Sequence, residues 1–230
     1  MAAGNVNIDV IELKNTVDGV EKIFRPTVIW DDRDVILFDT GMPGHLETIR
    51  AAMERLTGGR LTKIIITHQD YDHLGSLPEI VSGFGGKIEV YAHELTKPYI
   101  EGKEPLMKTQ NIVPKVTVDH ALTDGQVLPF CGGISVVFTP GHMPDHTSFY
   151  HHATKTLIVG DALTAADGEL QYPNPVFTLD KAGAIRSLDK FLDLDMEIAI
   201  CYHGGICRGN LKARIRELIA GGQEYVRKYA

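Results

Sequence analysis

The sequence is poor in the features that mark several large classes of protein. Only three of its 230 residues are cysteines, Cys131, Cys201 and Cys207, and no two of them form a C-x-x-C pair. This odd, unpaired set favours a reducing compartment over a disulfide-stabilised scaffold. No apolar run approaches the roughly 20 residues that cross a bilayer. Polar side chains interrupt residues 1–13, so we expect no signal peptide and a cytoplasmic protein.

Basic charge is also scarce. The chain has 23 lysines and arginines against 30 aspartates and glutamates, a formal net charge of −7, and no block of basic residues. This balance argues against a nucleic-acid surface. Apolar residues make up 43% of the sequence, enough for a buried core. Without a linker, repeat or low-complexity tract, residues 1–230 are predicted to form a single domain.

Apolar periodicity indicates a mixed arrangement of strands and helices. Thr27–Trp30 and Val35–Phe38 are predicted to form a β-hairpin, and the spacing of apolar residues predicts a helix over 46–56. The unbroken apolar run within 61–67 predicts a strand that is buried on both faces. A polar loop over 68–75 is expected to follow it. The other predicted elements are helices over 77–84, 181–192 and Leu211–Lys228, strands over 87–92 and 198–202, and two hairpins, 126–130 with 134–139 and 147–150 with Thr156–Gly160.

Two long segments, 97–114 and 165–178, contain prolines and few periodic apolar residues. Loops of this length in a compact domain are often functional. We therefore predict that these two segments wall a substrate pocket.

The sequence is, by contrast, rich in histidine, with ten against a single tryptophan. Four side chains able to ligate a metal follow the predicted buried strand within six residues: His68, Asp70, Asp72 and His73. Imidazole nitrogens and carboxylate oxygens are the ligands that zinc and iron take in proteins. A calcium-binding EF-hand loop is excluded, because Leu74 and Val81 would occupy positions that require oxygen ligands. The cluster therefore predicts a transition-metal or zinc site.

The pattern His68-x-Asp70-x-Asp72-His73 resembles the H-x-H-x-D-H signature of the metallo-β-lactamase superfamily, with Asp70 in place of the middle histidine. Four more short motifs follow the order of that family. They are Asp39-Thr40-Gly41, His142 in Thr139-Pro140-Gly141-His142, Asp161 in Val159-Gly160-Asp161, and His203 in Tyr202-His203-Gly204-Gly205. Each motif is a weak signal alone, but five in order over nearly the whole chain are a strong one.

The resemblance implies an α/β fold, the four-layer αβ/βα sandwich of this family, and a centre of two divalent metal ions. Zinc is the metal expected first, with iron or manganese as alternatives. The family pattern assigns His68, Asp70 and His142 to one metal, and Asp72, His73 and His203 to the other. Asp161 would bridge them, and Asp39 would support the ligands without ligating. The resemblance also implies a small-molecule substrate, and it allows a homodimer because dimers are common in the family.

The same resemblance implies a hydrolase in which a hydroxide that bridges the metals attacks an ester-like carbonyl. The expected substrate is a lactone, a carboxylic ester or a thioester. Asp72 and Asp161 are the expected catalytic carboxylates, and Tyr202 or Tyr172 could stabilise the oxyanion. The alternatives are a di-iron centre that reduces oxygen or nitric oxide, β-lactam hydrolysis, and a non-catalytic scaffold.

Asp70 is the departure from the family pattern. A carboxylate in place of an imidazole makes the site harder, which favours iron or manganese, or it leaves that site weakly occupied; the sequence leaves both open. The remaining histidines are expected not to ligate a metal. Of these, His146 is expected to support a ligand and His151 and His152 to face solvent in a hairpin turn, while His45, His93 and His120 have no partner at ligand spacing.

Overall fold

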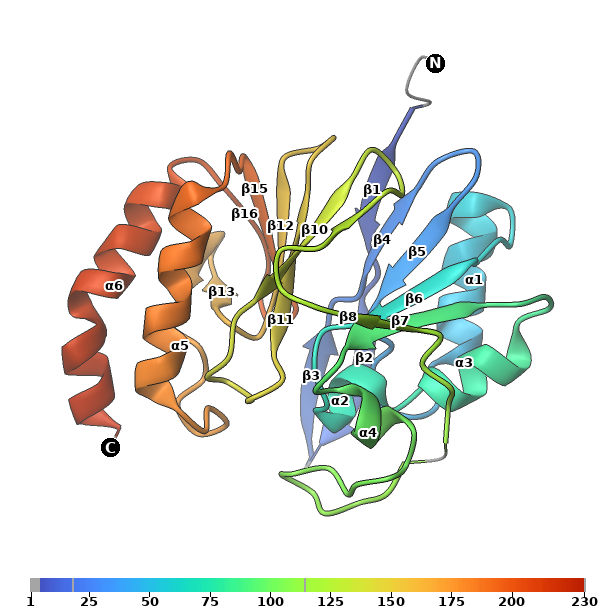
Figure 1. Ribbon diagram of the computed structural model, residues 1–230, viewed down its shortest axis with the longest axis horizontal. Coiled ribbons are helices and arrows are strands. Elements are labelled where there is room, and N and C mark those ends of the chain that lie inside the picture. Colours follow the sequence, from blue (N-terminus) through green and yellow to red (C-terminus); the bar gives the residue numbers. More distant parts are fainter. Residues whose placement is uncertain (1–4, 18, 114, 230) are drawn as a thin grey trace. The chain divides into compact units, whose positions relative to one another are not determined.

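The computed structural model of the protein describes residues 5–17, 19–113 and 115–229 (Figure 1). The strands and helices form two units along the chain, Met1–Leu122 and Thr123–Ala230. Each unit has its own six-stranded sheet. The single domain expected for residues 1–230 stays a prediction.

The sheet of the first unit combines an antiparallel and a parallel half. Strands β1, β4 and β5 pair antiparallel, whereas β5, β6, β7 and β8 pair parallel. In spatial order the strands are β1 (Asn7–Val10), β4 (Thr27–Trp30), β5 (Val35–Phe38), β6 (Lys63–Ile66), β7 (Glu89–His93) and β8 (His120–Leu122), and β2 (Leu13–Val17) and β3 (Val20–Phe24) form a separate hairpin. All four residues of β6 are buried, as predicted from its unbroken apolar run, and all four residues of β5 are buried as well. The carboxyl ends of β5, β6 and β7 consequently meet at one edge of the sheet.

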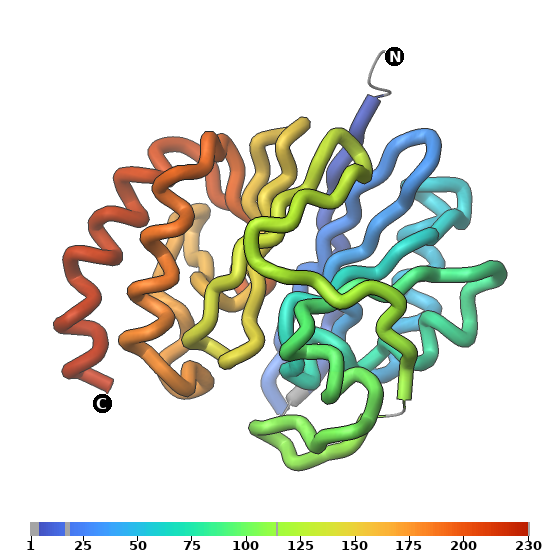
Figure 2. Tube along the Cα trace, in the orientation of Figure 1, coloured from blue at the N-terminus to red at the C-terminus, as the bar shows by residue number. Residues whose placement is uncertain are grey.

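Two helices cover one face of this sheet, α1 (Leu46–Thr57) and α3 (Leu77–Gly83) (Figure 1). Helix α1 buries Ile49 and Met53 and ends at Gly58, whose φ of 64° is left-handed, so the predicted helix is confirmed. The predicted polar loop over 68–75 is wrong in part, because it contains the short helix α2 (Tyr71–Leu74). After helix α4 (Lys97–Ile100) the chain has no helix or strand over 101–113 and 115–119 (Figure 2).

The sheet of the second unit is mainly antiparallel, and only β12 and β15 pair parallel. Its spatial order is β16 (Gly205–Arg208), β15 (Ile198–Cys201), β12 (Thr156–Gly160), β11 (Thr147–His151), β10 (Ile134–Phe138) and β9 (Val127–Leu128). The two hairpins predicted in this region, β9 with β10 and β11 with β12, are both present. Within the segment 165–178, predicted to be irregular, the structure instead has a hairpin of β13 (Thr164–Ala166) and β14 (Glu169–Gln171).

Helices α5 (Lys181–Ser187) and α6 (Leu211–Lys228) pack on this sheet around an apolar cluster that includes Leu188, Phe191 and Ile215. The helix predicted over 181–192 is divided, because α5 continues as a 3-10 helix over Leu188–Asp193. Among the described residues, no helix is both long and apolar enough to cross a membrane.

His151 corrects a prediction, because the structure buries it in β11 rather than exposing it in a turn. Its Nε2 donates to the carbonyl oxygen of Cys131 at 2.6 Å, and its Nδ1 accepts from the hydroxyl of Thr154 at 2.7 Å. Burial lowers the pKa of His151 below its ordinary value of 6.5. Folding therefore favours the neutral imidazole of His151, whereas His152 is exposed as predicted.

We expect the free energy of unfolding to decrease as the pH falls from about 7 to about 5, because the unfolded chain binds a proton at His151 more readily than the folded one. The contribution of His151 to stability is complete above the pKa of this residue in the unfolded chain and decreases as the pH falls below that pKa. The variant His151→Gln, which does not titrate, should have a shallower pH dependence. Urea unfolding in excess chelator measures this, with His152→Gln as the control. A His151→Gln slope equal to that of the wild type would contradict the assignment.

Candidate metal centre

Asp39 joins the ends of two parallel strands in the first unit. It follows β5 directly with a φ of 62°, a left-handed conformation that aspartate tolerates better than most residues. Its backbone N–H donates to the carbonyl of Ile65 at 2.9 Å. Its carboxylate accepts from the backbone N–H and from the hydroxyl of Thr67, each at 2.8 Å. The Asp39 carboxylate is thereby fixed between β5 and β6.

The same carboxylate orients His73. Nδ1 of His73 donates to Oδ2 of Asp39 at 2.8 Å, and the carbonyl oxygen of His73 accepts from the backbone N–H of Thr40 at 2.7 Å. His68 is held in a similar way, with its Nδ1 at 3.0 Å from the hydroxyl of Thr67. A carboxylate or hydroxyl on one imidazole nitrogen presents the other nitrogen to a metal. This is the supporting role predicted for Asp39.

The structure brings together all four ligands predicted in the first unit. Oδ2 of Asp70 lies 3.3 Å from Nε2 of His68, and Oδ2 of Asp72 lies 4.0 Å from Nε2 of His73. No sequence pattern predicts that Lys108 joins them, yet its ammonium forms an ion pair with Asp70. Lys108 lies in the segment predicted to wall the pocket, 38 residues from its partner.

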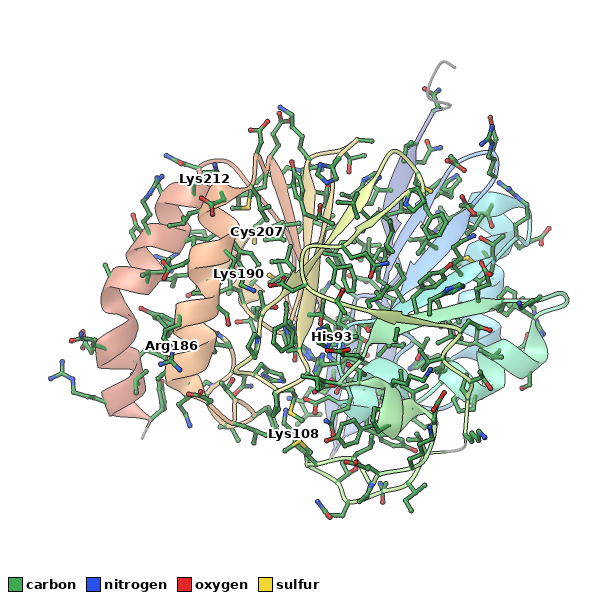
Figure 3. The ribbon with its side chains drawn as sticks, in the orientation of Figure 1. His93, Lys108, Arg186, Lys190, Cys207 and Lys212 are labelled. Atoms are coloured by element: carbon green, nitrogen blue, oxygen red, sulfur yellow. The ribbon has the colours of Figure 1, made fainter. Side chains whose placement is uncertain are left out.

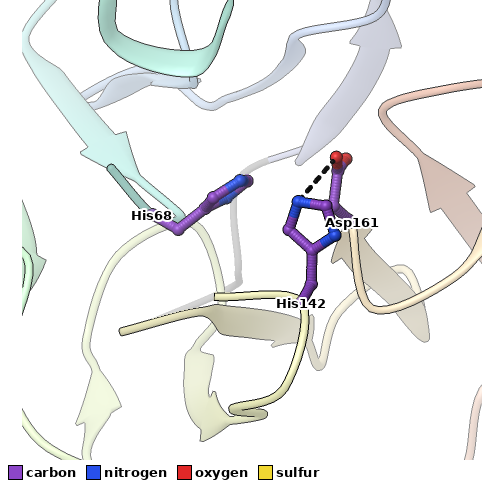
Figure 4. A group of neighbouring side chains, drawn as sticks. All are labelled: His68, His142 and Asp161. Carbon is purple, nitrogen blue, oxygen red and sulfur yellow. Dashed lines mark ion pairs between the residues drawn. The ribbon is translucent and has the colours of Figure 1, made fainter. Parts of the chain in front are cut away.

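The other three predicted ligands come together in the second unit. Oδ2 of Asp161 lies 3.4 Å from Nε2 of His142 and 3.3 Å from Nε2 of His203. Figure 4 shows the first of these ion pairs. A β-bulge at the end of β12 and a φ of 59° at Gly160 precede Asp161. Bulges redirect side chains next to functional sites, and this one places the Asp161 carboxylate against both imidazoles.

The loop that carries His142 is fixed by close packing. Nδ1 of His142 lies 3.3 Å from the hydroxyl of Thr178, which donates to the carbonyl of Asn174. A Cβ on Gly141 would lie 2.1 Å from the backbone nitrogen of Ala184, and Gly141 has a φ of 141°. Only glycine fits there, so the loop rests directly on the start of α5.

His146 supports Asp161, as predicted, and both of its ring nitrogens are hydrogen-bonded. Nε2 accepts from the backbone N–H of Asp161 at 2.9 Å, and Nδ1 donates to the hydroxyl of Thr139 at 2.9 Å. His146 is therefore a positioning residue.

The two tyrosines differ. Tyr202 is buried, and its ring packs edge-on against His203 with the centroids 5.3 Å apart. Tyr172 donates from its hydroxyl to the carbonyl of Leu218 in α6 at 2.9 Å and stacks on Tyr225. The suggested oxyanion role of Tyr172 is therefore wrong, because its hydroxyl is committed to the helix.

We expect His146→Ala to lower the affinity for a divalent metal by about tenfold, the lower end of the effect of removing a group that orients a ligand. The reason is that Asp161 loses the hydrogen bond that fixes its backbone. Competition with a chelator of known affinity measures the change, with His152→Ala as the control at an exposed histidine. Equal affinities in the two variants would rule out this role for His146.

Comparison with known proteins relates this chain to a family of hydrolases. A family model described as the metallo-beta-lactamase superfamily matches residues 26–203, a stretch that includes all seven predicted ligands. The chain is 29% identical over 214 residues to the probable metallo-hydrolase YflN of Bacillus subtilis, covering 80% of each protein. It is 30% identical over 158 residues to a hydroxyacylglutathione hydrolase of Methylobacterium nodulans, covering 68% of this chain but 52% of that protein.

Solved structures share the fold. A metallo-beta-lactamase from Pontibacter korlensis superimposes with a TM-score of 0.73 at 17% identity, covering 97% of this chain and 96% of that one. At this identity the likeness is evidence of fold alone. It confirms the predicted α/β class, the αβ/βα fold of the metallo-β-lactamase type.

Proposed function

Because the chain belongs to the metallo-beta-lactamase superfamily, we propose that its two ligand clusters hold two divalent metal ions and hydrolyse an ester-like bond. The family match spans both clusters, and each cluster pairs carboxylates with buried imidazoles. We assign His68, Asp70 and His142 to one metal, Asp72, His73 and His203 to the other, and Asp161 to both.

The donor set fits such ions. Four imidazoles and three carboxylates are ligands that zinc, iron and manganese accept. The hydrogen bonds from Nδ1 of His73 and of His142 leave Nε2 as the ligating atom in each case. We propose zinc first, with iron or manganese as alternatives because Asp70 adds a hard oxygen ligand.

When bound, two divalent ions would polarise the substrate carbonyl and lower the pKa of a water molecule. The protein residues supply orientation and a proton acceptor. The backbone N–H of Asp161 donates to His146, and the Asp161 carboxylate pairs with both His142 and His203, so it orients the two imidazoles relative to each other. We assign the role of proton acceptor to Asp72, whose side chain is 25% exposed and so can exchange protons with solvent. Tyr202, packed against His203, is our candidate for hydrogen bonding to the oxyanion.

Thioesters, lactones and carboxylic esters are the proposed substrates. The similarity to a hydroxyacylglutathione hydrolase supports a thioester, although the match spans about half the length of that relative. The observation that carries the proposal is the pairing of ligand imidazoles with fixed carboxylates in both units.

A di-iron redox centre is the second candidate, and Asp70 is the observation that favours it. Its carboxylate lies at a position where the family signature has a histidine, and carboxylate ligands suit iron. Metal analysis separates the two candidates: iron with a visible charge-transfer band supports redox chemistry, whereas colourless zinc-loaded protein supports hydrolysis.

We expect the protein to bind about two metal ions per chain when metal is in excess, and Asp161→Ala to lose both because one carboxylate serves both sites. Asp39→Ala should reduce metal content less, because it removes the support of His73 and of Thr67 but no proposed ligand. Mass-spectrometric metal analysis after dialysis against buffer that contains the metal measures this, with Asp189→Ala, at an exposed position, as the control. Equal metal content in Asp161→Ala and Asp39→Ala would contradict the assignment.

A panel of thioester, lactone, β-lactam and phosphodiester substrates tests the reaction. We expect hydrolysis of a thioester or lactone that is abolished by chelation, restored by added zinc or manganese, and lost in a folded His68→Ala variant. Hydrolysis that persists in metal-free protein would disprove the proposed function.

A further inference from the structure

Lys108 lies inside the ligand cluster of the first unit, on the loop that follows α4 (Figure 3). Its ammonium forms an ion pair with Oδ2 of Asp70, the same oxygen that lies 3.3 Å from Nε2 of His68. The Lys108 side chain is 20% exposed and that of Asp70 only 9%. Solvent therefore screens this pair less than an ordinary surface ion pair.

The loop is built to place Lys108 there. The backbone N–H of Met107 donates to Oε1 of the buried Gln69 at 2.8 Å, which ties the residue before Lys108 to the residue before Asp70. Lys108 lies within a turn in which the backbone N–H of Gln110 donates to the carbonyl of the buried Leu106 at 2.8 Å. Hydrogen bonds on both sides of Lys108 therefore fix the backbone that carries it.

The Asp70 carboxylate contacts Lys108 and His68 instead of capping helix α2. It precedes helix α2 at the position where an aspartate usually accepts a hydrogen bond from the first turn, yet its side chain makes no such capping bond. Its carbonyl oxygen accepts from the backbone N–H of His73 at 2.9 Å and from that of Leu74 at 3.3 Å. The carboxylate instead faces His68 and Lys108.

The charges of the two residues compensate each other. A neutral imidazole at the middle position of the signature carries no charge, whereas Asp70 carries one negative charge. Lys108 adds one positive charge, so the Asp70–Lys108 pair is neutral, as the imidazole would be. A metal that takes Asp70 as a ligand would therefore share the carboxylate with an ammonium, and two positive charges that contact one partly buried carboxylate repel each other more than they would in bulk water.

We propose that Lys108 is a resident counter-ion of Asp70 that competes with metal and makes the site of His68 and Asp70 the weaker of the two. This inference rests on the proposed metal centre. The protein should consequently bind one divalent ion tightly, at the site of Asp72 and His73, and a second one less tightly.

Titration of metal-free protein with zinc in the presence of a competing chelator tests the proposal. Lys108→Met removes the charge but keeps the length of the side chain, and we expect it to strengthen the weaker equivalent at least about tenfold while the tighter one is unchanged. Lys108→Arg keeps the charge and should retain a weak site. The matched control is Lys103→Met on the same loop, because Lys103 pairs with Glu101 at 2.6 Å. Circular dichroism verifies that each variant folds.

A double-mutant cycle with Asp70→Asn shows whether Lys108 acts through Asp70, since the effect of Lys108→Met should shrink when the carboxylate is absent. Unchanged or weakened zinc affinity in Lys108→Met, with two equivalents still bound, would overturn the role of Lys108 and leave the metal centre standing. Binding of a second equivalent only in Lys108→Met would support the role. No zinc binding in the wild type or in any variant would overturn the metal centre and this inference together.

Discussion

The first ligand cluster depends on the hydrogen bonds that the Asp39 carboxylate accepts from Thr67 and His73. One side chain ties the ends of β5 and β6 together and fixes the orientation of a ligand imidazole. It does so from a left-handed backbone conformation that most residues avoid. The buried parallel strands thus position the chemistry, because their carboxyl ends meet where Asp39 can reach the next strand and the turn beyond it.

In the second unit, different groups orient the predicted ligands. There His146 holds the backbone of Asp161, and the hydroxyl of Thr178 holds His142. The bulge at Gly160 turns the chain so that Asp161 faces two imidazoles. In both units the proposed ligands follow strand ends and are oriented by groups that we do not propose as ligands, which is the arrangement that a preorganised metal site requires.

The sequence predicted what local patterns encode. Unbroken apolar runs located β5 and β6, and periodic spacing located α1. Helix α2 and the β13–β14 hairpin were missed because they are very short and lack a periodic pattern. The buried state of His151 was missed because its partners, Thr154 and Cys131, are found only once the strands pair. Lys108 was missed for a related reason, since 38 residues separate it from Asp70.

The central claim is that histidines and aspartates, and no cysteine, hold two divalent ions. X-ray absorption spectroscopy at the edge of the native metal tests it most directly. In metal-saturated protein we expect a shell of nitrogen and oxygen ligands at about 2.0–2.2 Å and a second metal at about 3.5–4 Å. Sulfur ligands near about 2.3 Å, or a native protein without bound metal, would contradict it.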